Sequence, residues 1–293
     1  MKIGIIPNTT KHNIIEAVEK ILLSLKKYNV DALLGDTIYR LEKSLSETIK
    51  GTKIIPEPEL IAKSDFVVSL GGDGTMLNTS FEAKDYDTPI LGVNVGKLGF
   101  LAEFDFDSFD AFIPQLLDGN YLIEDRIALE AVLNEEGEKL FALNDIVIDK
   151  GYWPKMIELN LAINGEFVST FAADGLIIAT PTGSTGYALS AGGPIVSPKS
   201  NVITIIPIAP HTLTMRPLVL DSNEEINVEV KSGEEKIQIN CDGQRVNFAS
   251  PPLSIKIKRS SHPIRLVHSK EISYFQVLRN KLYWGIDARN NQN

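Results

Sequence analysis

Apolar and polar residues follow two different periods in the first hundred residues. Short apolar runs rich in β-branched residues predict buried strands, which we place at 2–6, 30–34, 65–70 and 89–95. Apolar residues at helical spacing predict helices at 13–27, 39–50 and 75–83. Strand and helix in repeated order predict a parallel sheet with right-handed crossovers, which is a Rossmann-like α/β domain.

From about residue 126 onward, short alternating or β-branched runs are separated by turn residues. This pattern predicts an all-β domain resembling a β-sandwich, with strands at 127–133, 141–149, 156–163, 175–179, 202–208, 218–220, 226–230, 236–241, 253–258 and 264–267. A short helix is expected at 185–191. Apolar residues recur with near-helical period across 271–284, and we expect this C-terminal helix to pack back on the first domain.

These patterns predict two domains. The α/β domain comprises 1–100 together with about 270–293, and the β-rich domain comprises 101–269. The length of 293 residues is compatible with this division.

Two glycine-rich turns, far apart in the sequence, each follow a predicted strand. They read Gly71-Gly72-Asp73-Gly74-Thr75 and Pro181-Thr182-Gly183-Ser184-Thr185-Gly186-Tyr187. A glycine-dense strand exit lets ligand oxygens approach backbone N–H groups, which is how many proteins hold phosphates. The first turn is not a Walker loop, because no Gly-Lys-Ser/Thr follows Gly74, and it is not a dinucleotide fingerprint, because Leu77 stands where the third glycine belongs.

Asp73 places a negative charge at the centre of an expected anion site. A carboxylate there can accept the proton of an alcohol that attacks phosphorus, and it can help to hold a metal ion bound to the phosphates. The alternative is that the turn only connects a strand to a helix, with Asp73 capping the helix at 75–83.

The second turn carries several hydrogen-bond donors. Thr182, Ser184 and Thr185 can donate to phosphate or ribose oxygens, and Tyr187 offers a flat face and a phenol. Asp174, at the start of the preceding strand, can accept a hydrogen bond from a ribose hydroxyl, or it is an ordinary turn aspartate.

Together these motifs resemble the motif series of the NAD kinases, in order from about residue 69 to 284. The similar segments are Gly71 to Leu77, Gly96-Lys97-Leu98-Gly99-Phe100-Leu101, Asn144-Asp145, Asp174-Gly175, Pro181 to Pro194, Pro210-His211-Thr212-Leu213 and Cys241-Asp242-Gly243-Gln244. The short Gly-Gly-Asp-Gly element alone is shared with diacylglycerol kinases, sphingosine kinases and phosphofructokinases. The longer second motif is far more specific.

The resemblance implies a reaction and a set of site residues. Asp73 would accept the proton of the 2′-hydroxyl of the adenosine ribose of NAD, and ATP with Mg²⁺ or another divalent ion would donate its γ-phosphoryl group. The donor phosphates would lie at Gly71, Gly72, Gly74 and Thr75. The residues implied to contact NAD are Asp73, Gly74, Asn144, Asp145, Lys155, Asp174, Thr185, Gly186, Tyr187, Ala188, Leu189, Ser190 and Gln244. The sequence does not identify direct metal ligands.

The chain departs from the family pattern at four positions, two of them among the implied NAD contacts and two elsewhere. Many family members carry glutamate in place of Asp145, alanine in place of Gly186, and a basic residue at or near Asn78 and Ala172. Fewer positive charges are therefore available for phosphates, which leaves the range of donors open, including inorganic polyphosphate in place of ATP. Preference between NAD and NADH is open as well.

Composition restricts the setting and the partners. The formal net charge is −9 with no long run of either sign, which argues against nucleic acid as a partner. Cys241 is the only cysteine, so no intrachain disulfide can form and a reducing compartment is expected. No apolar stretch reaches membrane-spanning length. We expect a soluble cytoplasmic protein without membrane contact, and the resemblance implies a homodimer or homotetramer.

Two other functions stay open at this point. A lipid kinase of the diacylglycerol kinase type would need an apolar acceptor site, which the sequence does not present. A non-catalytic nucleotide-sensing module would keep the pocket without the chemistry, and the presence of Asp73 disfavours it.

Overall fold

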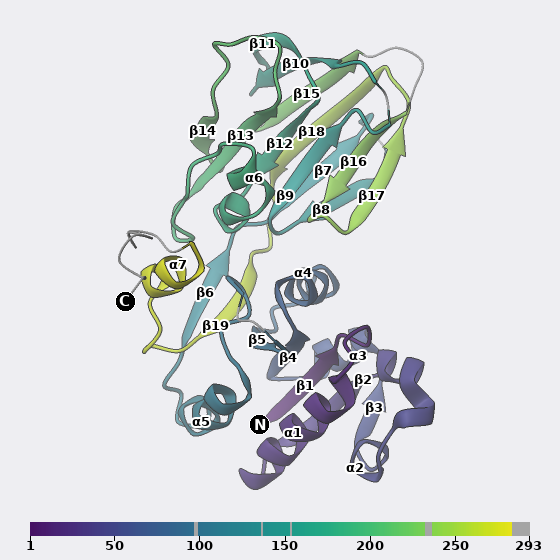
Figure 1. The fold of residues 1–293 in the computed structure, drawn as a ribbon, viewed down its shortest axis with the longest axis vertical. Helices are drawn as coiled ribbons and strands as arrows, with labels where there is room; N and C mark the ends of the chain where they lie inside the picture. The colour runs from purple at the N-terminus through teal and green to yellow at the C-terminus, as the bar shows by residue number, and fades with distance from the viewer. Residues whose placement is uncertain (97–98, 136, 153, 232–235, 283–293) are drawn as a thin grey trace, which may run out of the picture. The chain divides into compact units, whose positions relative to one another are not determined.

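The computed structural model describes the chain except for residues 97–98, 136, 153, 232–235 and 283–293, and except for the side chains of residues 43 and 44. Its internal contacts divide the chain into two compact units (Figure 1). Unit 1 contains Met1–Asp125 and the described chain from Arg265 on, and unit 2 contains Arg126–Ile264. The chain therefore passes between the units at 125/126 and 264/265, whereas the predicted domain boundaries lie at 100/101 and about 269/270.

Unit 1 is built on a sheet with the strand order β3-β2-β1-β4-β5-β19-β6. The pairs from β3 to β19 in this order are parallel, which confirms the Rossmann-like prediction. The strands are β1 (Lys2–Pro7), β2 (Asp31–Gly35), β3 (Lys53–Ile55), β4 (Phe66–Gly71), β5 (Ile90–Asn94), β6 (Leu122–Arg126) and β19 (Ile264–His268).

The helices of unit 1 are α1 (Ile14–Lys27), the 3₁₀ segment η1 (Asp36–Ser44), α2 (Glu47–Lys50), α3 (Glu57–Lys63), α4 (Asp73–Glu82), α5 (Phe106–Leu117) and α7 (Tyr274–Leu282). Helix α1 buries one apolar face, formed by Ile14, Ala17, Val18, Ile21, Leu22 and Leu25, in the same cluster as residues of β1 and β4. This is the face that its periodicity predicts. No helix in the described part of the chain is both long and apolar enough to cross a membrane.

Unit 2 consists of two antiparallel sheets with the strand orders β11-β10-β15-β18-β7-β8 and β14-β13-β12-β9-β16-β17. Their bounds are β7 (Leu129–Leu133), β8 (Lys139–Ala142), β9 (Asp145–Asp149), β10 (Ile157–Ile163), β11 (Glu166–Ala173), β12 (Gly175–Ala179), β13 (Val202–Ile208), β14 (Leu218–Asp221), β15 (Ile226–Lys231), β16 (Ile237–Cys241), β17 (Arg245–Ala249) and β18 (Leu253–Arg259). The short segments η2 (Thr182–Thr185) and α6 (Tyr187–Ser190) follow β12.

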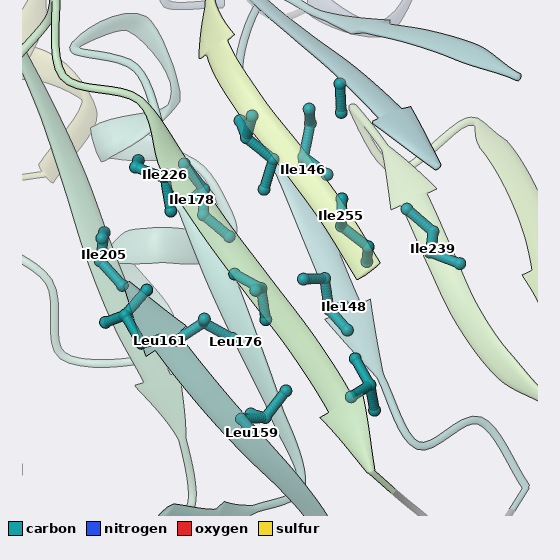
Figure 2. Packing of buried hydrophobic residues seen from close by; sticks show 14 of the residues in the cluster. Ile146, Ile148, Leu159, Leu161, Leu176, Ile178, Ile205, Ile226, Ile239 and Ile255 are labelled. Atoms are coloured by element: carbon teal, nitrogen blue, oxygen red, sulfur yellow. The ribbon is translucent and has the colours of Figure 1, made fainter. Parts of the chain in front are cut away.

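One apolar core lies between these two sheets. Figure 2 shows Ile146 and Ile148 from one sheet in the same cluster as Leu159 and Ile255 from the other. Residues two apart on β9 point into this core because side chains alternate between the faces of a strand. The predicted sandwich-like architecture is confirmed.

Several elements differ from the sequence prediction. The run at 264–267, predicted as part of the β-rich domain, is β19 of the unit 1 sheet, where Leu266 pairs in parallel with Ile90. The predicted helix at 39–50 is a 3₁₀ segment followed by the short α2. Helix α3 was not predicted, because Pro56 and Pro58 suggest an interruption; they stand before and within its first turn, where proline is tolerated.

The C-terminal helix is present as α7, which belongs to unit 1 and buries Leu278. The last two positions of the predicted range, including Trp284, lie outside the described residues.

Candidate active site

The first glycine turn places Asp73 between a strand and a helix. Strand β4 ends at Gly71, Gly72 is extended, and α4 begins at Asp73 itself. A Cβ on Gly71 would lie 2.1 Å from the hydroxyl oxygen of Thr75, which accepts a hydrogen bond of 3.0 Å from the Asn8 amide. Glycine is therefore required at position 71 by the fold of the turn itself.

The Asp73 carboxylate is held by three successive backbone N–H groups. Phe100 donates to Oδ2 at 2.8 Å, and Leu101 and Ala102 donate to Oδ1 at 3.0 and 3.1 Å. A Cβ on Gly99 would lie 1.7 Å from Oδ1. The side chain thus contacts the segment after β5 and does not cap the helix at 75–83, so the capping alternative is wrong.

A cavity of about 250 Å³ lies beside this turn, within unit 1. Hydroxyl and amide side chains dominate its lining, together with one arginine and two glutamates. The lining includes Asn8, Thr9, Thr10, Thr37, Arg40, Glu57, Thr75, Asn78, Thr79 and Glu82. Burial raises the pKa of Glu57, and the nearby Glu82 acts in the same direction. The cavity therefore combines anion-binding donors with carboxyl groups that would repel a bare phosphate.

The second glycine turn uses several of its hydroxyls for its own structure. The Ser184 hydroxyl donates to the carbonyl of Pro181 at 2.7 Å and accepts from the N–H of Val196 at 3.1 Å. The buried Thr182 accepts a hydrogen bond from Arg126. Ser184 and Thr182 are thus less available to a ligand than the sequence suggests, whereas Tyr187 is 47% exposed.

The second turn packs closely against residues 143–144, which lead into β9. A Cβ on Gly183 would lie 2.1 Å from the carbonyl oxygen of Asn144. The Asn144 carbonyl also accepts the N–H of Thr180 at 2.8 Å, and Ala179 pairs with Asp145 across the sheet. The close approach therefore fixes Asn144 and Asp145 relative to the second turn.

Asp242 holds the same segment from the other side. Its carboxylate accepts the N–H groups of Leu143, Asn144 and Asp145 at 3.0, 2.6 and 3.3 Å, and it forms an ion pair of 2.6 Å with Arg245. The sequence includes Asp242 in a family-like motif but assigns it no role. Asp242 stands before Gly243 in the turn between β16 and β17, and Asp-Gly is typical of a hairpin turn. The sequence therefore indicates only a turn residue and does not indicate that Asp242 binds the backbone of residues 143–145.

A second cavity, of about 420 Å³, lies within unit 2. It is lined by Asn144, Asp145, Val147, Asp149, Tyr187, Gln238, Asn240, Asp242 and Gly243. Among the described residues, the buried Oδ1 atoms of Asn144 and Asn240 have no hydrogen-bond partner. Such a lining favours a ligand group that brings hydrogen-bond donors.

The acidic groups of this cavity influence one another. Asp145 is only 4% exposed, and burial, with a contribution from Asp242, raises its pKa from 3.8 to about 7. Burial also raises the pKa of the Tyr187 phenol, as do Asp149 and Asp145. Asp145 therefore keeps its proton to a much higher pH than an ordinary aspartate.

The other residues implied to contact NAD lie at varied places. Thr185, Gly186 and Leu189 are half-buried, Ala188 is buried and Ser190 is exposed on the second turn. Asp174 forms an ion pair of 2.7 Å with Lys150. Lys155 and Gln244 are exposed and are not among the residues that line the unit 2 cavity. The structure thus brings together Asn144, Asp145 and Tyr187 from the predicted set.

No metal site is evident in the described part of the chain, where no group of three or more His, Cys, Asp and Glu side chains could hold an ion. The single cysteine, Cys241, is buried, and its burial raises the thiol pKa to about 12. It is therefore a packing residue of β16 and not a nucleophile.

Comparison with known proteins identifies the relationship. The chain matches the ATP-NAD kinase N-terminal domain family over residues 3–121 and the ATP-NAD kinase C-terminal domain family over residues 143–269. The chain belongs to the NAD kinase family. The resemblance inferred from the motifs is confirmed.

Similar proteins extend over almost the whole chain. The NAD kinase of Chlorobium phaeovibrioides is 40% identical over 98% of this chain and 100% of its own, and that of Chloroherpeton thalassium is 38% identical over 97% and 98%.

Two solved structures of the family share the fold. Yeast NADH kinase, solved with NADH, has a TM-score of 0.88 at 26% identity over 98% of this chain and 89% of its own. An NAD kinase from Archaeoglobus fulgidus, solved with ATP, has a TM-score of 0.76 at 28% identity over 97% and 99%.

The two glycines of the second turn allow a direct test of the close approach. We expect Gly183→Ala to lower the free energy of unfolding by about 3 kcal/mol, because the new methyl group would overlap the Asn144 carbonyl. We expect Gly186→Ala to change it by less than about 1 kcal/mol, because the Cβ has ordinary contacts apart from 3.2 Å to the Gly183 carbonyl. Urea unfolding measures both, and equal effects would contradict this account.

The buried carboxyl group of Asp145 predicts a pH dependence of stability. Its folded-state pKa of about 7 exceeds the usual 3.8, so the folded protein binds more protons between these values and loses stability as pH rises from about 4 through 7. At 1.36 kcal/mol per pKa unit the loss is at most about 4 kcal/mol. We expect Asp145→Asn to flatten the dependence of the thermal midpoint on pH between 5 and 8.

The exposed Asp85 provides a matched control, because it forms only a surface ion pair of 3.4 Å with Lys84. Asp85→Asn should leave the slope of the thermal midpoint against pH as in the wild type. A slope unchanged by Asp145→Asn would show that Asp145 is ionised in the folded protein at these pH values.

Proposed function

We propose that this chain transfers the γ-phosphoryl group of ATP to the 2′-hydroxyl of the adenosine ribose of NAD, giving NADP and ADP. Membership of the NAD kinase family supports the reaction, and the geometry of Asp73 carries the proposed mechanism. The lipid kinase and nucleotide-sensing alternatives find no support among the relatives, which are NAD kinases.

Asp73 is oriented for proton transfer. Its Oδ2 atom accepts one hydrogen bond from Phe100, and a carboxylate oxygen can accept a second one. A ribose hydroxyl bound there would pass its proton to Oδ2 while its oxygen bonds to the γ-phosphorus, and the bond to ADP breaks. Because the three N–H groups fix the carboxylate, little reorganisation is needed at that step.

The donor nucleotide is proposed to occupy the unit 1 cavity and the adjoining turn. The N-terminus of α4 and the hydroxyl of Thr9 offer donors to phosphate oxygens. Gly71, Gly72, Gly74 and Thr75 form this turn. Arg40 is the one basic residue among those that line the cavity.

The divalent ion is proposed to enter with ATP. The described residues contain no group of three or more His, Cys, Asp and Glu side chains that would hold a metal on their own. Mg²⁺ usually keeps several waters and binds chiefly through substrate phosphates, so MgATP serves as the substrate. Glu57 and Glu82 would then face a neutralised phosphate group.

The unit 2 cavity is proposed to bind part of NAD. Its lining offers the oxygens of Asn144, Asp145 and Asn240, which suit ribose hydroxyls or an amide N–H and disfavour the diphosphate. Tyr187 adds a flat face, and Gly186 leaves room beside the Asp145 carboxyl group. The remaining residues implied by the resemblance, including Lys155, Asp174 and Gln244, stay predictions.

The chain is further proposed to form a homodimer or homotetramer in the cytoplasm. Val246 and Phe248 on the edge strand β17 are large apolar residues with 43% and 53% exposure, and contact with another copy would cover them. Light scattering is expected to give two or four times the chain mass, and a monomer at micromolar concentration would contradict this.

We predict that Asp73→Asn lowers the turnover of NAD by at least about a hundredfold, because an amide cannot accept the proton. NAD affinity, measured by calorimetry, should stay within about threefold of the wild type. NADP formed from ATP, Mg²⁺ and NAD is followed with an NADP-specific dehydrogenase. Asp85→Asn, the same substitution at the exposed position after α4, should retain wild-type turnover.

Two results would contradict the proposal at different points. Folded wild-type protein that forms no NADP would exclude the reaction. Asp73→Asn with near-normal turnover would exclude Asp73 as the proton acceptor, and loss of NAD binding in this variant would make it a substrate-positioning residue instead.

A further inference from the structure

A half-buried carboxylate–imidazole pair, Glu103 and His268, joins the segment that holds Asp73 to the end of β19, and the proposed reaction does not use it. Glu103 Oε2 lies 2.5 Å from His268 Nδ1, and Glu103 Oε1 accepts the N–H of Ser269 at 3.1 Å. The side chains of Glu103 and His268 are 9% and 15% exposed. Both carboxylate oxygens of Glu103 are therefore engaged by the end of β19.

Three consecutive residues of this segment bind three different elements. The N–H of Ala102 donates to Asp73 at the start of α4, the side chain of Glu103 binds the end of β19, and the N–H of Phe104 donates to Gly92 of β5 at 3.1 Å. The segment also lies tightly on β5, because a Cβ on Gly92 would be 2.7 Å from the Ala102 Cα. Its position is fixed from three directions.

A second carboxylate lies on the other side of the imidazole. Glu124 of β6 places Oε2 3.9 Å from His268 Nε2, and β6 is next to β19 in the sheet. Burying Glu103 without its partner would leave a charge unpaired, which is costly. Glu103 and His268 therefore form one structural unit, and loss of either should release the segment from β19.

We propose that Glu103 and His268 are positioning residues for Asp73. By fixing the backbone of residues 100–102 to β19, they keep its three N–H groups in place and thereby hold the Asp73 carboxylate toward the attacking hydroxyl. A displacement of less than 1 Å at a reacting group is enough to slow a reaction strongly. The inference rests on the proposed role of Asp73 as proton acceptor.

The test compares Glu103→Ala and His268→Ala with the conservative Glu103→Gln. We expect each alanine variant to lower kcat about tenfold or more, with KM for NAD and for ATP within about threefold of the wild type. Glu103→Gln should restore most of kcat, because its amide can accept from Ser269 and donate to His268. The double alanine variant should be no slower than the slower single variant.

Amide hydrogen exchange supplies a readout that does not depend on turnover. In Glu103→Ala the N–H groups of residues 100–102 should exchange faster, whereas those of α1 should be unchanged. Lys270→Ala is the control, since it removes a hydrogen bond of 2.8 Å to Asn120 just beyond β19 without touching the pair. It should change neither kcat nor these exchange rates.

Several outcomes would overturn the inference. These are unchanged kcat in folded Glu103→Ala, a rise in KM without a fall in kcat, or unchanged exchange at residues 100–102. If Glu103→Ala does not fold, His268→Ala decides the question by the same exchange rates, because it removes the same contact. Wild-type protein that forms no NADP would instead contradict the proposed function, and hydrogen exchange would still show whether the pair holds the segment.

Discussion

Each candidate site depends on a carboxylate that accepts hydrogen bonds from three consecutive backbone N–H groups. Asp73 accepts from residues 100–102 in unit 1, and Asp242 accepts from residues 143–145 in unit 2. In both cases Oδ2 takes the first N–H and Oδ1 takes the other two. Successive N–H groups that converge in this way form a concave anion site. Here the protein fills that site with its own carboxylate, which orders a loop that would otherwise lack regular hydrogen bonds.

The two anchors differ in what they leave free for chemistry. Asp242 is buried and pairs with Arg245, and both of its carboxylate oxygens hold the segment before β9. Asp73 is half-buried at a strand end and keeps capacity on Oδ2, so the same arrangement orients a group that can react. Asp145 shows the opposite case: it is buried without such N–H donors, and its pKa rises to about 7. Burial raises the pKa of Asp242 as well, but there the backbone N–H groups and Arg245 act against the rise.

The sequence predicts the helices, strands and fold class well, but it does not predict the contacts of Asp73 and Asp242 with backbone N–H groups. The periodicity of α1 and the alternation along β9 follow from burial on one face, so each can be read locally. The assignment of β19 fails because the short run at 264–267 does not reveal which sheet it joins. Leu266 pairs with Ile90 of β5, which lies 176 positions earlier in the chain. Asp242 is missed for a related reason. Its partners, near residue 144, are about a hundred positions away, and the local signal of Asp-Gly indicates only a turn.

The motif glycines also serve a purpose that their sequence suggests only in part. The sequence predicts that they let ligand oxygens approach the backbone, yet at Gly71, Gly99 and Gly183 a Cβ would overlap the protein itself, at 2.1, 1.7 and 2.1 Å. These glycines let the chain pack against its own carboxylate, hydroxyl and carbonyl groups. At Gly72 the nearest atom would lie 3.8 Å from a Cβ, which leaves space beside the backbone. A ligand that approaches the backbone closely is therefore expected at Gly72, so the role of each glycine depends on its distance from the rest of the chain and not on its place in the motif.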